Sequence, residues 1–440
     1  MGPIGWSRTE FVRCRTFWKS AKGSALRLGI LSQWFDPEPG PAAIPGVYAR
    51  EFVQAGHEVS VLTGFPNYPD GKLYSGYRQR FHKTSHNGGM SVTRVPLFPS
   101  HGSSAVGRAL NYSSFAASAT AFGGRSFRGL DAVWVYNSPV SVSLPLLAHT
   151  RLGRIPYFLH VQDLWPDSLV ESGMFPGGAV GSVAAATVRR IVRMTEKYSA
   201  VVGVISPSVR ELILSRNPDI PPSKIIYVPN PTDEQLFRPL SGLPMAERQV
   251  RDHDAFTLMY VGAVGRVQGL ETLLDAAEIL KSRPEIHFSI VGDGIARQTL
   301  EEDAHRRGLT AVTFRGRIVK EMVPAVMASA DAQLVSLAAS EFLKYTTPSK
   351  IASLLASEVP IIANIAGDGA KMLEESGAAL NSAPGDAEAL AVAVARMADM
   401  SAQRRQQMAI RGRVYYDSNL SAHVAANKIV EALRGSLNGN

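Results

Sequence analysis

Short apolar runs alternate with helix-like stretches along most of the chain, and this alternation restricts the fold more than any other feature. In residues 26–64 the run LRLGILSQWF precedes a stretch with Ile44, Val47, Tyr48 and Phe52 on one helical face, and the run HEVSVLTG follows. A strand, a helix and a second strand in this order form the unit of a parallel sheet. The chain is therefore expected to be an α/β protein.

The alternation falls into two blocks separated by a polar stretch. The first block ends in the segment SKIIYVPNPTD, and the pattern restarts at FTLMYVGAV after a stretch that contains proline, glycine and arginine. We expect a basic extension at 1–25, a domain at 26–238, a linker at 239–254, a second domain at 255–415 and a C-terminal helix at 416–440 that can return to the first domain. Ligands of such doubly wound sheets bind at the carboxyl ends of the strands.

Length and composition agree with two globular domains. A chain of 440 residues is too long for one ordinary core, and a hydrophobic content of 45% is typical of globular proteins. The single cysteine, Cys14, excludes an intrachain disulfide and fits a reducing compartment. The sequence has no run of about 18 uninterrupted apolar residues, so we expect no spanning helix.

The net charge of +8 favours an anionic partner, such as lipid headgroups or a sugar diphosphate. Nucleic acid is not expected as a partner, because the basic residues are not organised around a recognition helix or a stacking sheet. The first 25 residues are basic and lack the apolar core of a signal peptide. They are expected to be a loose basic extension or the product of a start codon chosen too far upstream, or else a membrane-touching arm that uses Phe11, Phe17 and Trp18.

Two glycine turns follow strands of the second block. In VGAVGRVQGLETLLDAA, a turn with Gly265 and Arg266 leads into a helix whose N-terminus can face an anion. The second turn, VGDG, contains Gly292 and Gly294. Either turn alone is typical of an ordinary connection between a strand and a helix. Two of them in one domain indicate a phosphate-binding site.

A third element, TTPSK, opens a helix at Ser349 and Lys350, where Ser349 can cap the first turn. A lysine beside a helix N-terminus is normally unfavourable, and an anionic ligand would reverse this. Lys350 is therefore either a diphosphate ligand or a solvated side chain.

The segments AGHEVSVLTGFPNYPDGK, VQDLWPDSL, VGAVGRVQGLETLLDAA, VGDG and TTPSK…LLASEVPIIA together resemble glycosyltransferase family 4. Within it they are similar to the N-acetylfucosaminyltransferase-like and colanic-acid-type branch of bacterial surface polysaccharide synthesis, over about residues 26–430. The resemblance implies a GT-B fold, in which two Rossmann-like doubly wound domains face a cleft. It also implies a retaining transferase that needs no metal or other cofactor and takes a sugar from a UDP-sugar donor to a lipid-linked saccharide acceptor.

By the resemblance, the donor would be a UDP-linked N-acetylated deoxyhexose and the acceptor would be linked to polyprenyl diphosphate. The residues expected to bind the donor are Gly40, Gly265, Arg266, Gln268, Gly292, Gly294, Arg317, Glu341, Lys344, Ser349 and Lys350. Many relatives have a lysine where this chain has Gln268, and two glutamates where it has Tyr345 and Ser353. Glu341 and Lys344 lie nearby in sequence as substitutes.

On the acceptor side, His160 and Asp163 end a strand of the first block. Asp163 would orient or activate an acceptor oxygen and His160 would act as a base. The alternative is that His160 is a core histidine and Asp163 caps the next turn.

Arg189, Arg193 and Lys197 recur every four residues on a helix, which is either a solvated face or a contact with anionic lipid. We expect a cytoplasmic protein, peripheral on the inner face of the cytoplasmic membrane. Asp252 and Asp254 resemble a metal-binding pair, but they lie in the expected linker and are not expected to bind metal.

Two other functions remain open. The missing glutamate pair allows a non-catalytic subunit that binds a nucleotide sugar and regulates a partner. The second is a sugar-nucleotide epimerase, which can share this fold. Donor turnover by the purified chain separates the first from a transferase, and product analysis without an acceptor separates the second.

Overall fold

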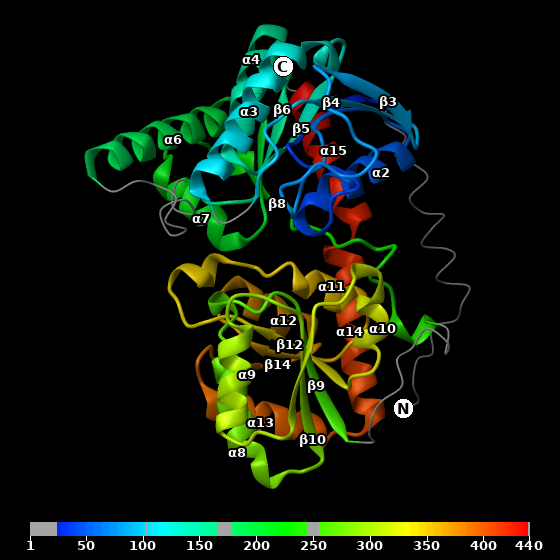
Figure 1. Cartoon of the computed structure of the whole chain (residues 1–440). Helices are drawn as coiled ribbons and strands as arrows, with labels where there is room; N and C mark the ends of the chain where they lie inside the picture. Colours follow the sequence, from blue (N-terminus) through cyan, green and yellow to red (C-terminus); the bar gives the residue numbers. More distant parts are fainter. Residues whose placement is uncertain (1–23, 102–103, 166–177, 244–254, 439–440) are drawn as a thin grey trace, which may run out of the picture.

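The computed structural model describes residues 24–101, 104–165, 178–243 and 255–438, which form two domains arranged one above the other (Figure 1). Each domain is built on one sheet with helices on its faces. The α/β, two-domain organisation expected from the sequence is confirmed. Residues 1–23 of the expected extension and 244–254 of the expected linker, with Asp252 and Asp254, lie outside the described residues.

The first domain holds an eight-stranded sheet in the order β3-β4-β2-β1-β5-β6-β7-β8. Neighbouring strands are parallel, except that β3 runs antiparallel to β4. The strands are β1 (Arg27–Leu31), β2 (Glu58–Gly64), β3 (Lys83–Asn87), β4 (Met90–Val95), β5 (Ala132–Asn137), β6 (Tyr157–Val161), β7 (Val201–Val204) and β8 (Ile225–Tyr227). The helices are α2 (Ile44–Gln54), α3 (Ala105–Phe122), α4 (Ser143–Gly153), α6 (Gly178–Tyr198) and α7 (Pro207–Arg216).

The second domain holds a six-stranded parallel sheet in the order β11-β10-β9-β12-β13-β14. Its strands are β9 (Phe256–Val261), β10 (Ile286–Val291), β11 (Val312–Gly316), β12 (Ala332–Ser336), β13 (Ile361–Asn364) and β14 (Ala379–Ser382). Its helices are α8 (Glu271–Ile279), α9 (Arg297–Arg306), α10 (Val323–Met327), α11 (Lys350–Ala356), α12 (Asp368–Ser376), α13 (Ala387–Ala398) and α14 (Ala402–Asn419).

Burial explains why the central strands are continuous apolar runs rather than alternating ones. Every residue of β5, β6 and β7 is buried, because helices cover both faces of the parallel sheet. The edge strand β3 is the opposite case, since all five of its residues are exposed. It reaches β4 through a turn at Gly88 and Gly89, whose positive φ angles of 56° and 78° suit glycine.

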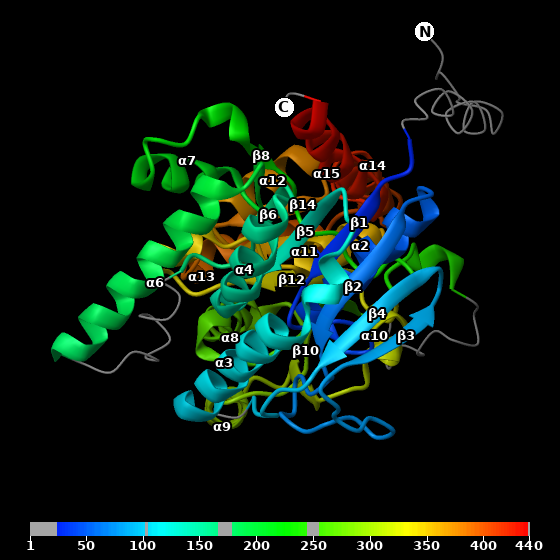
Figure 2. The ribbon, with the colours of Figure 1, turned by 90° about the horizontal axis from the view of Figure 1, so that it is seen from above.

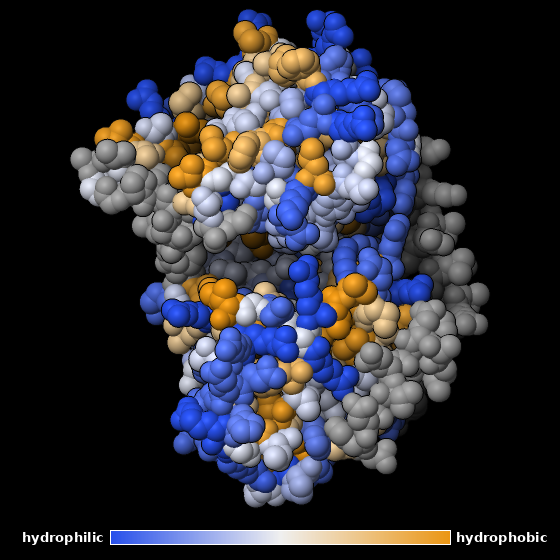
Figure 3. Space-filling model, in the orientation of Figure 1, coloured by the Kyte–Doolittle hydropathy of each residue, from blue (hydrophilic) through white to orange (hydrophobic). Residues whose placement is uncertain are grey.

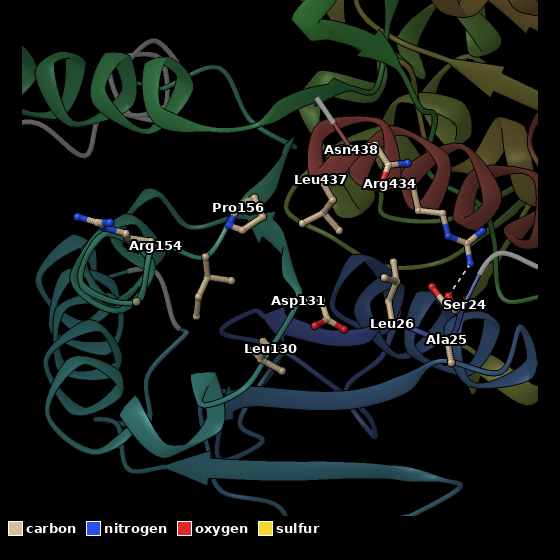
Figure 4. A pocket seen from close by; sticks show the side chains of 12 residues that line it. Ser24, Ala25, Leu26, Leu130, Asp131, Arg154, Pro156, Arg434, Leu437 and Asn438 are labelled. Atoms are coloured by element: carbon tan, nitrogen blue, oxygen red, sulfur yellow. Dashed lines mark hydrogen bonds between the residues drawn. The ribbon is translucent and has the colours of Figure 1, made fainter. Parts of the chain in front are cut away.

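The chain crosses between the domains twice. After β8, Phe237, Leu240 and Leu243 pack into the core of the second domain. The chain returns after α14, and α15 (Ala422–Asn438) packs against α2, β6 and β7 of the first domain (Figures 1 and 2). Arg434 of α15 donates a hydrogen bond to the carbonyl of Ser24 at 3.1 Å, which ties the last helix to the start of the described chain (Figure 4).

The carboxyl ends of the two sheets face each other. Ser208, just after β7, donates hydrogen bonds from its backbone N–H and its Oγ to the carboxylate of Asp368 at the start of α12, both at 2.8 Å. Ser206 Oγ lies 3.5 Å from the carbonyl oxygen of Tyr345, which follows β12. Figure 3 shows the surface hollowed between the two domains at this level. The ends of the strands that would bind ligand therefore line one cleft.

Candidate functional site

The two glycine turns of the second domain lie against each other at the carboxyl ends of β9 and β10. Gly262 N–H donates to the carbonyl of Val291, and Val264 N–H donates to the carbonyl of Asp293, both at 2.9 Å. A Cβ atom on Gly292 would lie 1.8 Å from the carbonyl oxygen of Gly262, and one on Gly294 would lie 2.4 Å from that of Val264. Gly292 and Gly294 are thus required for the packing of the two turns, whatever else they contact.

Lys350 joins this pair of turns to α11. Its Nζ lies 3.4 Å from the centre of the Tyr260 ring and 3.0 Å from the place where a Cβ of Gly262 would be. Tyr260 is fixed beneath it, because its hydroxyl donates to the carbonyl of Ala263 at 2.6 Å. Burial lowers the pKa of Lys350 to about 7. Among the described residues, no carboxylate or hydrogen-bond acceptor compensates this amine.

Arg266 and Gln268 lie in the same turn and differ in role. Gln268 Oε1 accepts a hydrogen bond from Gly265 N–H at 3.0 Å, so this side chain caps its own turn instead of pointing to a ligand. Arg266 is exposed, and no hydrogen bond or ion pair holds it within the described part of the chain. Arg266 is therefore available to a ligand that binds at this turn.

The other residues of this domain that were expected to bind the sugar donor are all exposed: Arg317, Glu341, Lys344 and Ser349. Arg317 directly follows β11, two strands away from β9 in the sheet. Glu341 and Lys344 pair with each other at 2.6 Å. Ser349 precedes α11, but its side chain makes no capping hydrogen bond, so the expected cap is wrong.

The two positions that carry glutamates in many relatives contribute to contacts between the domains. The carbonyl of Tyr345 faces Ser206, as described above. Ser353 Oγ lies 2.7 Å from Thr232 Oγ1, in the segment that leaves the first domain. A serine at this position therefore contributes to the domain junction.

Asp163 follows β6 on the cleft side of the first domain. Ser138 Oγ donates to its Oδ2 at 2.7 Å, which favours the ionised form. Burial nevertheless raises the pKa of this carboxyl above its ordinary value. Neighbouring Gln162 accepts a hydrogen bond from Asn230 at 2.5 Å and is held in place. Asp163 is thus an oriented, partly exposed carboxylate.

His160 lies in the core and not in the cleft. It is fully buried, its ring contacts those of Tyr48, Trp134 and Phe158, and its Nε2–H donates to the carbonyl of Val228 at 2.8 Å. Burial lowers the pKa of this imidazole to about 4. The role of a base that touches the acceptor is therefore wrong for His160, because no substrate atom can reach the ring.

Gly40 lies in the loop between β1 and α2, with a positive φ of 66°. A side chain missed by the sequence analysis, Glu38, organises this loop. Its buried carboxylate accepts backbone N–H bonds from Phe35 at 3.1 Å and from Asn67 and Tyr68 at 2.8 Å. Gly40 itself is exposed, and a Cβ there would contact nothing within 4 Å.

The helix α6 borders a pocket of about 260 Å³ next to Asp163. Arg189 and Arg193 line this pocket, and Arg193 Nε donates to Asn217 at 2.9 Å, whereas Lys197 is exposed beyond it. The pocket also holds Glu196, whose pKa is raised to about 7 by burial. Glu196 was not predicted as a site residue, although a single acid inside the basic stripe was a visible signal.

No helix of the described residues is long and apolar enough to span a membrane. No three histidine, cysteine or acidic side chains among them gather as a metal site would require.

Comparison with known families divides the chain in the same way as the two sheets. A model described as "Glycosyl transferase 4-like domain" matches residues 40–231. A second model, described as "Glycosyl transferases group 1", matches residues 255–400.

Two curated proteins are similar over much of the chain. The putative colanic acid biosynthesis glycosyl transferase WcaI of Escherichia coli K12 is 29% identical over 338 residues, which cover 71% of this chain and 77% of WcaI. The probable glycosyltransferase WbjE of Pseudomonas aeruginosa is 24% identical over 253 residues, which cover 57% of this chain and 61% of WbjE.

Solved structures with the same architecture include HepE of Anabaena in complex with UDP and glucose. It matches with a TM-score of 0.65 and 16% identity, over 93% of this chain and 99% of HepE. The sucrose-phosphate synthase of Thermosynechococcus elongatus matches with a TM-score of 0.63 and 18% identity, over 94% of this chain and all of the synthase. At these identities the likeness concerns the fold, which is the GT-B arrangement of two facing domains.

Proposed function

We propose that this chain, which is a glycosyltransferase of the GT-B type, transfers a sugar from a UDP-sugar to a saccharide linked to polyprenyl diphosphate. In this proposal the sugar is an N-acetylated deoxyhexose, the anomeric configuration is retained, and the product belongs to a bacterial surface polysaccharide. The reaction takes place in the cytoplasm, on the inner face of the cytoplasmic membrane.

The uncompensated amine of Lys350 is the observation that carries the proposal. A half-buried cation without an anionic partner is costly, and burial lowers the pKa of this amine to about 7. A diphosphate beside Gly262 would supply the missing negative charge and restore the charged form of the amine. Arg266, exposed on the adjoining turn, would add a second cation.

The nucleotide is inferred from the relatives. The structure of HepE contains UDP and glucose, and WcaI and WbjE are both named as glycosyltransferases. The proposed class of product is supported by the name of WcaI, which refers to colanic acid.

The reaction requires that one side of the cleft stabilises the negative charge of the leaving diphosphate and that the other side orients the acceptor hydroxyl. The bond between the sugar C1 and the diphosphate oxygen breaks, and its electron pair stays on the phosphate. Lys350 and Arg266 stabilise this charge. The acceptor oxygen forms the new bond to C1, and its proton passes to the departing diphosphate. Asp163 accepts a hydrogen bond from the acceptor hydroxyl and orients it.

The test is a donor screen with the purified chain. UDP-, GDP- and ADP-sugars are compared by calorimetric binding, and bound donors are then assayed for transfer. We expect the parent to bind UDP-sugars more tightly than GDP- or ADP-sugars. We expect Lys350→Met to bind UDP-sugars much more weakly than the parent does. Lys371→Met, at an exposed lysine of the same domain, is the matched control and should bind like the parent. Equal binding of UDP-sugars by Lys350→Met and the parent would contradict the proposal.

A further inference from the structure

The positive charge of the chain is concentrated in residues 71–162. This segment contains ten lysine and arginine residues and one acidic residue, Asp131. Asp131 is already paired, with Arg27 at 3.0 Å. The net charge of the whole chain is +8, so the rest of the sequence is close to neutral. A single part of the first domain therefore accounts for the basic character of the protein.

The same segment exposes large apolar side chains. It forms the β3–β4 edge of the sheet and the helices α3 and α4, which pack against each other (Figure 2). The exposed apolar side chains of this segment, with their exposed fractions, are Leu152 (88%), Phe81 (73%), Val106 (70%), Leu144 (55%), Phe98 (50%), Leu110 (48%) and Phe122 (40%). Figure 3 shows hydrophobic residues gathered over α3 and α4. We call this surface the α3–α4 face.

Basic and apolar groups are interleaved at the end of the face that lies away from the cleft. A hollow of about 910 Å³ there is lined by Phe122, Arg125, Arg128 and Leu152, among others. The rings of Phe81 and Phe122 contact each other with centroids 5.3 Å apart. Arg154 lies on the border of the neighbouring pocket of about 610 Å³ and extends away from it (Figure 4).

We propose that the α3–α4 face docks on an anionic lipid bilayer. Anionic headgroups attract the arginines, and the exposed phenylalanine and leucine side chains gain an apolar environment at the boundary of the acyl chains. A nucleic acid would use the basic groups only, since its phosphate backbone offers nothing to exposed leucines. The combination of charge and apolar surface therefore favours a bilayer.

The position of the face fits a lipid-linked acceptor, and to that extent the inference rests on the proposed function. The first half of α3 borders the acceptor side of the cleft, where Tyr112 contacts Trp34 with ring centroids 6.3 Å apart. Burial raises the pKa of the same tyrosine, and the charge of Asp163 adds to this effect. A bilayer on this face would lie beside the place where the acceptor must enter. The stripe of Arg189, Arg193 and Lys197 is then a secondary contact.

The test is co-sedimentation of the full chain with vesicles of phosphatidylcholine, with and without phosphatidylglycerol. The charge variant is Arg125→Gln/Arg128→Gln/Arg154→Gln, and the apolar variant is Phe81→Ser/Leu152→Ser. The matched controls change exposed residues of the second domain: Lys371→Gln/Arg396→Gln/Arg404→Gln and Val392→Ser/Val414→Ser. UDP binding is measured for every variant.

We expect the parent to bind the anionic vesicles at low salt and to be released at high salt. Both variants of the face should bind at least about tenfold more weakly, while the controls bind like the parent. Unchanged vesicle binding in both face variants would overturn the docking surface, as would a parent that binds duplex DNA but not vesicles. UDP binding is measured separately from vesicle binding. A parent protein that does not bind UDP would contradict the proposed function and leave the docking result standing.

Discussion

The two sides of the cleft are built by different means. On the donor side, backbone groups of two glycine turns bond to each other, and the half-buried amine of Lys350 lies over an aromatic ring. On the acceptor side, side chains hold one another, as Ser138 holds Asp163 and Asn230 holds Gln162. A site made by backbone leaves glycines at fixed positions in the sequence, whereas a site made by side chains depends on burial that a sequence does not show.

The largest expected effect lies on the donor side. Lys350→Ala and Arg266→Ala each remove a cation that stabilises the departing diphosphate, so each should lower turnover by about 10²-fold or more. Turnover is measured with a saturating UDP-sugar. Near-normal rates in both variants would mean that the donor site is elsewhere.

On the acceptor side, Asp163 and His160 should respond differently. Asp163→Asn removes the charge that orients the acceptor, so we expect turnover to fall by about 10²-fold at an unchanged melting temperature. His160→Phe leaves the buried carbonyl of Val228 unpaired, which should cost about 1–3 kcal/mol of stability and change the turnover of the folded protein little.

Both variants are assayed for turnover and thermal unfolding. A His160→Phe protein that melts like the parent but has lost its activity would restore the histidine as a base.

The protonation of Lys350 gives a smaller and more specific effect. Its pKa of about 7 in the free protein means that the amine is charged below this pH and neutral above it. A diphosphate binds the charged form, so UDP affinity should fall by up to about tenfold per pH unit as the pH rises above about 7. Lys350→Arg should flatten this dependence, because arginine stays charged. Calorimetric titration of the parent and of Lys350→Arg with UDP at several pH values checks this pH dependence. If the UDP affinity of Lys350→Arg declined as steeply as that of the parent, the titrating group would not be Lys350.

The smallest expected effect is that of chelation. If cationic side chains and backbone groups neutralise the diphosphate, EDTA should leave the transfer rate unchanged. Loss of activity with EDTA and rescue by Mg²⁺ or Mn²⁺ would bring Asp252 and Asp254, which lie outside the described residues, back as candidates for a metal site.

The sequence predicted the parallel strands well because buried strands are continuous apolar runs. It missed the hairpin of β3 and β4, since all residues of β3 are exposed and form no apolar pattern. The pair Asn87-Gly88 was a readable turn signal there. It also missed the short β14, in which only Ser382 is buried.

The site residues were likewise predicted only where the local sequence carries a recognisable pattern. The glycine turns and Lys350 were found from local sequence, because their backbone chemistry is local. The role of His160 as a base was wrong and its alternative, a core histidine, was right, since a histidine at the end of a strand can point either into the core or into the cleft. Gln268 was expected to contact the donor, yet it lies three residues after Gly265, which is the spacing of a helix cap.

The return of α15 to the first domain has a consequence for the order in which the protein is completed during synthesis. Five residues of this last helix, Ala425, Ala426, Ile429, Val430 and Leu433, belong to the same buried cluster as Tyr48, Phe52 and Trp134 near the start of the chain. A ribosome releases the first domain's strands long before it makes α15. The domain that emerges first therefore closes its core only after α15 has been made, and its apolar face stays uncovered until then.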